Sequence, residues 1–129
     1  MQEFEPGVGS GNILLVDDES TVLETSSMML ELLGFSVTGH TSPQSALDSL
    51  KDCTPIDVIF TDLDMPEMNG REFANAVRAI SADIPVIVVS GYVLDEEDWK
   101  PDFDGILMKP FRVQDLKDKV DEFLAKKDH

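Results

Sequence analysis

The stretch that decides the fold is Ile56-Asp57-Val58-Ile59-Phe60-Thr61-Asp62-Leu63-Asp64-Met65-Pro66-Glu67-Met68-Asn69-Gly70. Its first part, residues 56–61, is mostly apolar and rich in β-branched and aromatic residues, which favours a buried strand of a parallel sheet. Asp62 follows this run directly, and Asn69-Gly70 then turns the chain into a helix predicted over about residues 71–80. An acid at the end of a buried strand is a candidate functional residue, because open parallel α/β sheets bind ligands outside the carboxyl ends of their strands.

Three other apolar runs also end in polar side chains, namely an acidic pair, a hydroxyl and an ammonium. If these runs are parallel strands, their carboxyl ends meet at the same edge of the sheet as Asp62. The polar side chains then form one site. The residues concerned are Asp17 and Asp18 after residues 13–16, Ser90 after residues 86–89, and Lys109 after residues 105–108.

Strand-like and helix-like segments alternate along the chain. This predicts a single α/β domain, with a doubly wound parallel sheet of five strands and helices on both faces. Residues 1–11 are rich in glycine and are expected to be a flexible lead-in or linker, so the domain is placed at residues 12–127. The predicted strands are 12–17, 35–39, 56–61, 84–89 and 105–108, and the predicted helices are 20–33, 43–51, 71–80 and a last one from about residue 113.

The least regular segment runs from Tyr92 to Asp104. It carries six acids and has Pro101 in its second half. Because the residue before a proline is pushed out of the α conformation, a helix in this segment is predicted to be short, over about residues 95–100.

Composition limits the classes of function. The chain has 129 residues, 42% of them hydrophobic, which suits one domain with one core. A formal net charge of −16 repels nucleic acid, and no apolar stretch approaches the ~20 residues of a membrane span. Neither nucleic acid nor a membrane is therefore an expected partner of this domain. The single cysteine, Cys53, cannot form an internal disulfide, which fits the cytoplasm.

Three carboxylates at one sheet edge favour a bound divalent cation. Like charges at short range raise one another's pKa values, and Mg²⁺, which prefers carboxylate oxygens and is usually bound beside phosphate, keeps such groups ionised. A carboxylate beside Mg²⁺ can attack phosphorus and become an aspartyl phosphate, with Lys109 as a point charge for the phosphoryl oxygens. Two simpler interpretations stay open: Asp17-Asp18 only caps the next helix, and the Ser90 hydroxyl only pairs with backbone.

Taken in order, these residues resemble the receiver domain of two-component response regulators, a chemotaxis-regulator-like family. The resemblance covers about residues 12–127 and implies a flavodoxin-like sheet with strand order 2-1-3-4-5. The motifs that carry it are Val16-Asp17-Asp18-Glu19, residues 62–70, Val89-Ser90-Gly91 and Lys109-Pro110-Phe111.

The resemblance also implies a role for each site residue. The metal is Mg²⁺, bound by two carboxylates and one backbone carbonyl, while a third acid holds metal-bound water. The Lys109-Pro110 bond is expected to be cis. The implied roles are phosphoacceptor and metal ligand for Asp62, direct metal ligand for Asp18, holder of metal-bound water for Asp17, carbonyl ligand for Asp64, switch hydroxyl for Ser90 and phosphate-binding lysine for Lys109.

The implied function is that of a phosphoacceptor in a cytoplasmic two-component phosphorelay, rather than an enzyme. The donor is expected to be a phosphohistidine on a sensor histidine kinase or a histidine phosphotransfer protein, and the modified domain is expected to change conformation. The chain is either a stand-alone regulator or the C-terminal receiver of a hybrid sensor kinase. The Gly-rich lead-in favours the second.

Two departures from the family pattern predict an atypical signalling surface between Tyr92 and Ile106. Many receivers carry Tyr or Phe three residues before the lysine, where this chain has Ile106. The span from Ser90 to Lys109 is also shorter than usual, so the fourth helix is expected to be truncated or irregular. Asp64 and Tyr92 match two variable positions that, in this family, flank the path of the water that attacks the acyl phosphate.

Two other functions are alternatives. Asp62-Leu63-Asp64 also resembles the Asp-x-Asp of haloacid-dehalogenase-like phosphatases, but those enzymes place this motif after the first strand and carry a cap domain, for which the chain has no room. The other alternative is a degenerate receiver that only binds partners. The presence of all the site side chains opposes it.

Overall fold

The computed structural model describes residues 11–52 and 55–127, with side chains up to residue 124. Within these residues, five strands alternate with five helices. The predicted lead-in, apart from Gly11, lies outside the described residues, as does Cys53. The strands are β1 (Asn12–Val16), β2 (Ser36–His40), β3 (Val58–Asp62), β4 (Val86–Ser90) and β5 (Gly105–Met108). The helices are α1 (Ser20–Leu32), α2 (Pro43–Lys51), α3 (Gly70–Ile80), α4 (Glu96–Trp99) and α5 (Val113–Lys127).

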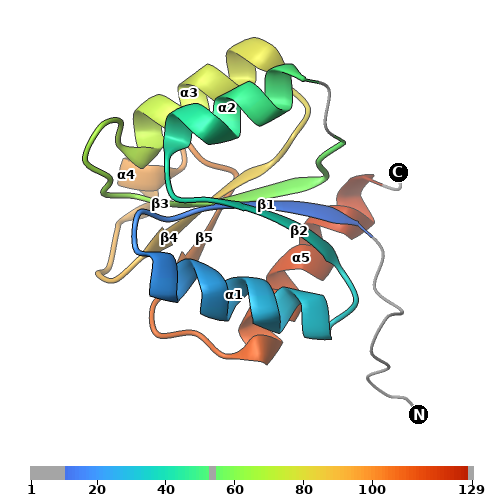
Figure 1. Ribbon diagram of the computed structural model, residues 1–129. Helices are drawn as coiled ribbons and strands as arrows, with labels where there is room; N and C mark the ends of the chain where they lie inside the picture. The colour runs from blue at the N-terminus through green and yellow to red at the C-terminus, as the bar shows by residue number, and fades with distance from the viewer. Residues whose placement is uncertain (1–10, 53–54, 128–129) are drawn as a thin grey trace.

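The strands form one parallel sheet in the order β2-β1-β3-β4-β5, which confirms the predicted fold. Helices α1 and α5 cover one face of the sheet, and α2 and α3 cover the other (Figure 1). The chain therefore forms three layers. The carboxyl ends of all the strands lie at one edge of the middle layer, as parallel pairing requires.

The central strands are continuously apolar because both of their faces are buried. Alternate residues of β1, β3 and β4 enter two separate core clusters, one on each side of the sheet. Leu14 and Ile59 pack in the cluster that includes Phe73 of α3, whereas their neighbours Ile13 and Val58 pack in the opposite cluster. A continuous run such as residues 13–16 therefore fits only a strand with helices on both sides.

Local caps explain where several helices begin and end. Ser42 is the N-cap of α2 and its side chain accepts the N–H of Ser45, with Pro43 as the first helical residue. Asn69 and Glu72 form a capping box at the start of α3, with reciprocal hydrogen bonds of 2.9 and 3.0 Å. Gly34 takes a φ of 98° just beyond α1, which a residue with a Cβ rarely adopts.

Four of the five strands differ from the prediction by one or two residues, and β1 and β2 differ by one residue only. Strand β3 begins at Val58 rather than Ile56 and includes Asp62 as its last residue. Strand β4 begins at Val86, after Pro85, and includes Ser90. Proline has no N–H to donate to a neighbouring strand, although the Pro85 carbonyl does accept the N–H of Ile59 at 3.0 Å.

Helix α4 is a single turn with no buried residue, which confirms the predicted short helix. Asp95 precedes it, and Lys100 and Pro101 follow it. Among the residues that the structure describes, no helix is long and apolar enough to cross a membrane.

Candidate functional site

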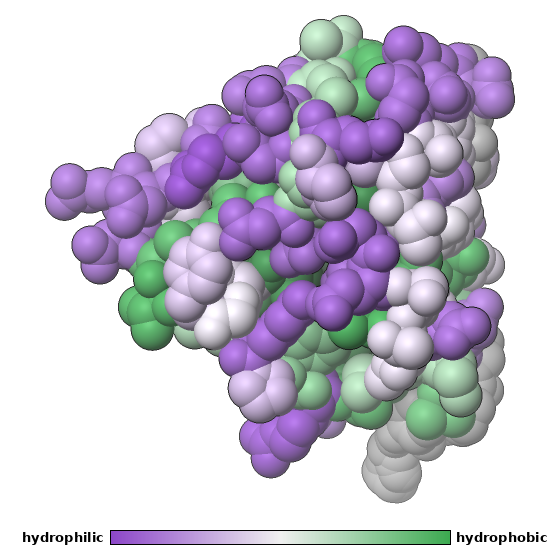
Figure 2. Space-filling view, turned by 60° about the vertical axis from the view of Figure 1, so that its left-hand side comes forward, coloured by the Kyte–Doolittle hydropathy of each residue, from purple (hydrophilic) through white to green (hydrophobic). Residues whose placement is uncertain are grey.

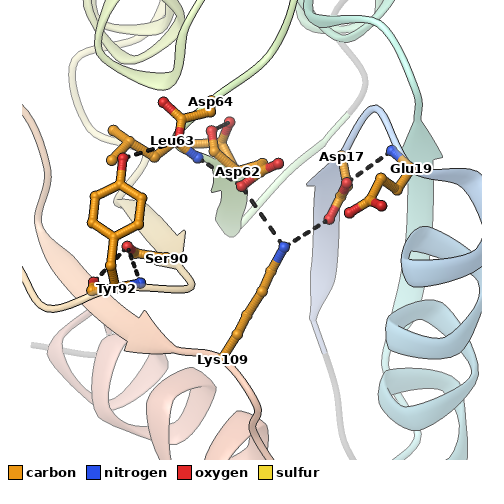
Figure 3. Close-up of polar contacts among 9 residues, drawn as sticks. Asp17, Glu19, Asp62, Leu63, Asp64, Ser90, Tyr92 and Lys109 are labelled. Atoms are coloured by element: carbon orange, nitrogen blue, oxygen red, sulfur yellow. Dashed lines mark hydrogen bonds and ion pairs between the residues drawn. The ribbon is translucent and has the colours of Figure 1, made fainter.

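The sheet brings the predicted site residues together at one edge (Figure 3). Asp62 is the last residue of β3 and pairs in register with Val89 of β4, which places Asp62 beside the end of β4 at Ser90. Asp17 follows the last residue of β1, and Lys109 follows the last residue of β5. The parallel register therefore gathers these side chains from four separate stretches of sequence.

Three carboxylates form the centre of the site. Oxygen atoms of Asp17, Asp18 and Asp62 all lie within 4.8 Å of one another. Asp17 is buried, Asp62 is partly buried and Asp18 is exposed. The cluster is thus closed on the side of the sheet and open to solvent on the other.

The acidic pair does not cap the following helix. Helix α1 has Glu19 as its N-cap, with no side-chain hydrogen bond to its free N–H groups. Asp17 Oδ1 instead accepts the N–H of Glu19 at 2.9 Å, ahead of the helix. This hydrogen bond orients the Asp17 carboxylate, so that its other oxygen faces the site.

Lys109 places its ammonium between two of the acids. Its Nζ lies 3.6 Å from Asp17 Oδ2 and 3.8 Å from Asp62 Oδ1, and the side chain is largely buried. The Lys109 backbone N–H donates to the Ser90 carbonyl at 2.7 Å, which ties the ends of β5 and β4 together. The Lys109-Pro110 peptide bond is cis, as predicted.

Asp62 is difficult to ionise in this environment. Burial raises the pKa of Asp62 to about 6, and the negative charges of Asp17 and Asp18 add to the rise. The Lys109 charge and the Leu63 N–H, which donates to Asp62 Oδ1 at 2.9 Å, oppose it. A cation beside Asp62 would favour the ionised form of its carboxylate.

The Ser90 hydroxyl is buried and bonded to backbone. Its Oγ donates to the Tyr92 carbonyl at 2.7 Å and accepts the Tyr92 N–H at 3.1 Å. The simpler interpretation of Ser90 as a backbone partner thus describes the structure as it stands. The hydroxyl can turn toward Asp62 only by giving up the bond that it donates to the Tyr92 carbonyl.

Tyr92 also contacts the loop after β3, a link that sequence reasoning missed. Its hydroxyl donates to Asp64 Oδ2 at 2.9 Å. This hydrogen bond raises the pKa of Tyr92, burial and the Asp64 charge act in the same direction, and the positive charge of Arg71 opposes them. The sequence indicated that Asp64 and Tyr92 both flank the site, but not that they bond to each other.

Gly70 allows the start of α3 to pack against the backbone of Asp62. A Cβ at position 70 would lie 2.6 Å from the Asp62 carbonyl oxygen and 3.1 Å from Leu63 Cα. The Gly70 N–H donates to the Leu63 carbonyl at 2.7 Å. A glycine here lets the turn between β3 and α3 close tightly behind the acid.

A groove of about 560 Å³ opens beside Lys109. Thr21 and Met29 of α1 line one side, and Lys109, Pro110 and Phe111 line the other. Figure 2 shows the side of the molecule that lies at the left of Figure 1, where hydrophilic residues cover most of the surface and smaller apolar areas lie between them. The groove reaches Lys109, and the carboxylate cluster itself meets solvent through the exposed Asp18.

The carboxylate cluster fits Mg²⁺. The ion binds hard oxygen ligands at 2.0–2.1 Å in an octahedron, so opposite ligands are about 4.2 Å apart. Adjacent ligands of the same octahedron are about 2.9 Å apart. Acidic oxygens that all lie within 4.8 Å of one another could therefore bind one such ion by moving closer together. The exposed side at Asp18 leaves room for the waters that Mg²⁺ retains.

Comparison with protein-family models matches residues 13–121 to the response regulator receiver domain. The chain belongs to this family. The receiver domain is 34% identical to part of the sensor kinase CckA of Brucella abortus over 93% of its length, but spans only 13% of that relative. It is 30% identical to the response regulator receiver protein CpdR of Brucella abortus, with 87% of this chain and 95% of CpdR covered.

Solved structures show the same fold. A receiver domain protein from Clostridium thermocellum is 29% identical, with a TM-score of 0.82 over 92% of this chain and 97% of that one. The receiver domain of the sensor histidine kinase PA1611 from Pseudomonas aeruginosa, whose structure has a magnesium ion in its active-site cleft, is 24% identical. It aligns with a TM-score of 0.82 over 91% of this chain and 99% of its own length.

Proposed function

We propose that this receiver domain is a Mg²⁺-dependent phosphoacceptor, modified on Asp62 by a phosphohistidine of a sensor histidine kinase or a histidine phosphotransfer protein. The observation that carries the proposal is the position of the Asp62 carboxylate, which shares one cluster with Asp17 and Asp18 and lies 3.8 Å from the Lys109 ammonium. The domain catalyses only its own modification and is otherwise a signalling module, not an enzyme.

The transfer uses Asp62 as the nucleophile. One of its oxygens attacks the phosphorus, a P–O bond forms, and the P–N bond to the donor's imidazole breaks. The imidazole leaves with the electron pair of that bond. Lys109 stabilises the charge on the transferred oxygens as a fixed point charge.

The acids hold the metal in this proposal. Asp18, Asp62 and the Asp64 carbonyl would bind Mg²⁺, and Asp17 would hold a water molecule beside it. When bound, the ion neutralises charge on the phosphoryl oxygens. The magnesium-bound receiver of PA1611 and the oxygen chemistry of the cluster support this assignment.

The modified domain signals by a change in conformation. A phosphoryl oxygen on Asp62 is a stronger acceptor than the Tyr92 carbonyl that now receives the Ser90 hydroxyl. To move the population from mostly inactive to mostly active, the modification must favour one state by roughly 3–5 kcal/mol. Two or three charge-assisted hydrogen bonds, including one from Ser90, are sufficient.

The parent protein is proposed to be a cytoplasmic hybrid sensor kinase with this domain at its C-terminus. The similarity to part of CckA supports this proposal, whereas the similarity to nearly all of CpdR favours a stand-alone regulator. The two possibilities differ in the gene. A kinase reading frame that runs directly into Met1 would establish the hybrid, and a stop codon followed by a start signal there would establish the stand-alone regulator.

Intact-mass measurement with acetyl phosphate and Mg²⁺ tests the function. We expect the wild-type domain to gain the mass of one phosphoryl group, and Asp62→Asn or the wild type in EDTA to gain none. Asp83→Asn, which removes an exposed acid after α3, should gain the same mass as wild type. An Asp62→Asn variant that is still modified would contradict the assignment. Sustained turnover of a generic phosphate ester would favour the phosphatase.

Lys109→Ala separates metal binding from transfer. Removal of a positive charge beside three carboxylates should leave Mg²⁺ binding at least as tight, as measured by calorimetry. The rate of mass gain should fall on the order of 10²-fold, because a fixed charge for the developing oxyanion is lost. An unchanged rate would remove Lys109 from the mechanism.

A further inference from the structure

Helix α4 has little packing of its own. It is one turn long, none of its residues is buried, and Trp99 is only packed against the edge of the core under α2 and α3. A segment with so few apolar contacts is expected to move readily. Its position relative to the site therefore depends on the few polar contacts that reach it.

Arg71 supplies several of those contacts. Its Nη1 donates to the Asp98 carbonyl in α4 and forms an ion pair of 2.8 Å with Asp102 Oδ2. The guanidinium also lies 6.0 Å from the ring centroid of Phe103, which is 2% exposed. One side chain thus holds both α4 and the turn that leads into β5.

Arg71 is also linked to Asp62, the proposed phosphoacceptor, through backbone contacts. Arg71 is the second residue of α3, and Gly70 before it packs against the Asp62 carbonyl with no room for a Cβ. The Gly70 N–H bonds to Leu63, whose own N–H bonds to the Asp62 carboxylate. The chain of contacts from the Asp62 carboxylate to α4 is therefore continuous and tight.

We propose that Arg71 couples the state of Asp62 to the position of α4 in this protein. The inference rests on the proposed function, because it takes phosphorylation of Asp62 as the input. A shift of the turn between β3 and α3 moves Arg71, and Arg71 carries Asp98 and Asp102 with it. Such a route suits a chain that has Ile106 on β5 where an aromatic side chain could otherwise respond to Ser90.

Arg71→Met tests the coupling. It keeps an unbranched apolar stem but removes the guanidinium. Arg78→Met is the matched control, since Arg78 is also on α3, is similarly exposed and pairs at 3.9 Å with an acid that lies outside α4, Asp104. Asp102→Asn removes the ion pair from the other side, with less effect on packing.

Each variant is measured by two methods, before and after phosphorylation or the binding of beryllofluoride with Mg²⁺. Intact mass reports the modification itself. Emission of Trp99, the only tryptophan of the chain, together with amide chemical shifts over residues 95–104, reports α4.

We expect wild type and Arg78→Met to gain the phosphoryl group and to change at residues 95–104. Arg71→Met should gain the same mass but lose that change, and Asp102→Asn should lose part of it. A variant that carries both Arg71→Met and Asp102→Asn should show the same loss of change as Arg71→Met alone, as expected for two residues that act through one contact.

The coupling is overturned if Arg71→Met keeps the full change over residues 95–104. It is also overturned if phosphorylated wild type shows no change there in either readout. A wild-type domain that gains no mass would instead refute the proposed function, and the mass readout distinguishes that failure from a failure of Arg71 alone.

Discussion

Asp62 is a carboxylate held where ionisation is unfavourable. Burial and two neighbouring acids disfavour its charge more than Lys109 favours it, which raises its pKa to about 6. The negative charge of such an acid is stabilised by any partner that brings positive charge, or is reduced when one of its oxygens forms a new covalent bond. The property that would suit Asp62 to the proposed phosphoryl transfer therefore lowers the stability of the folded state.

We predict that Asp62→Asn stabilises the metal-free fold above pH 6. A carboxyl whose pKa is raised from 3.8 to about 6 contributes stability below about pH 4, and that stability is lost as the pH rises through about 6. Above about pH 6, the free energy of unfolding of Asp62→Asn should exceed that of wild type by roughly 1–3 kcal/mol. Urea unfolding in EDTA measures the difference.

Two controls test whether the stability difference comes from the charge of Asp62. At about pH 4 the difference should disappear, because Asp62 is then protonated in the folded wild type. Asp83→Asn should show no comparable gain at either pH. A destabilised Asp62→Asn at neutral pH without metal would show that the Asp62 charge is compensated by contacts other than those described.

Sequence reasoning located the polar residues that end the strands but not those that contact one another across loops. Asp17, Asp62 and Lys109 were predictable because parallel strands align their carboxyl ends. The Tyr92 hydroxyl reaches Asp64 only through the conformations of two loops. No periodicity in the sequence fixes those conformations, so the hydrogen bond could not be predicted.

At the scale of single elements, the tight turn between β3 and α3 controls the geometry of the site. Gly70→Ala should destabilise the domain by about 1–3 kcal/mol, since its Cβ would lie 2.6 Å from a backbone oxygen that cannot move aside easily. Urea unfolding measures the loss, and the rate of mass gain with acetyl phosphate should fall as well.

Gly91→Ala is the matched control for that turn. Position 91 also lies at the carboxyl edge of the sheet, but a Cβ there meets nothing within 4 Å. The variant should unfold within about 0.5 kcal/mol of wild type. Equal effects at positions 70 and 91 would mean that backbone flexibility, not the close contact with Asp62, determines the result.

The elements were predictable wherever burial or a breaker residue acts locally. Continuous apolar runs marked the central strands, and Pro101 marked the short α4. The start of β3 was not predictable, because Ile56 is as apolar as the residues of the strand itself, 58–60, and is also buried. Its exclusion from the strand depends on hydrogen bonding with β1, which the sequence does not display.

At the scale of the whole molecule, the net charge of −16 opposes the compact state. The distance over which charges repel one another, the Debye length, falls from about 30 Å at 0.01 M salt to about 8 Å at 0.15 M. We predict that NaCl over this range raises the unfolding temperature by roughly 3–5 °C, equivalent to about 1 kcal/mol for a chain of 129 residues. Thermal unfolding in EDTA measures it, and a lower temperature at high salt would show that ion pairs outweigh the repulsion.

The hydrogen bond from the Lys109 N–H to the Ser90 carbonyl has a consequence for protein design. Strand pairing sets the distance between the Ser90 hydroxyl and the Lys109 ammonium. It also sets the distance between the acids at the ends of β1 and β3. A designer could graft the site onto another three-layer scaffold by copying four strand ends and their alignment, with helices of unrelated sequence. A slip of one residue in any of the three pairings would separate the grafted groups.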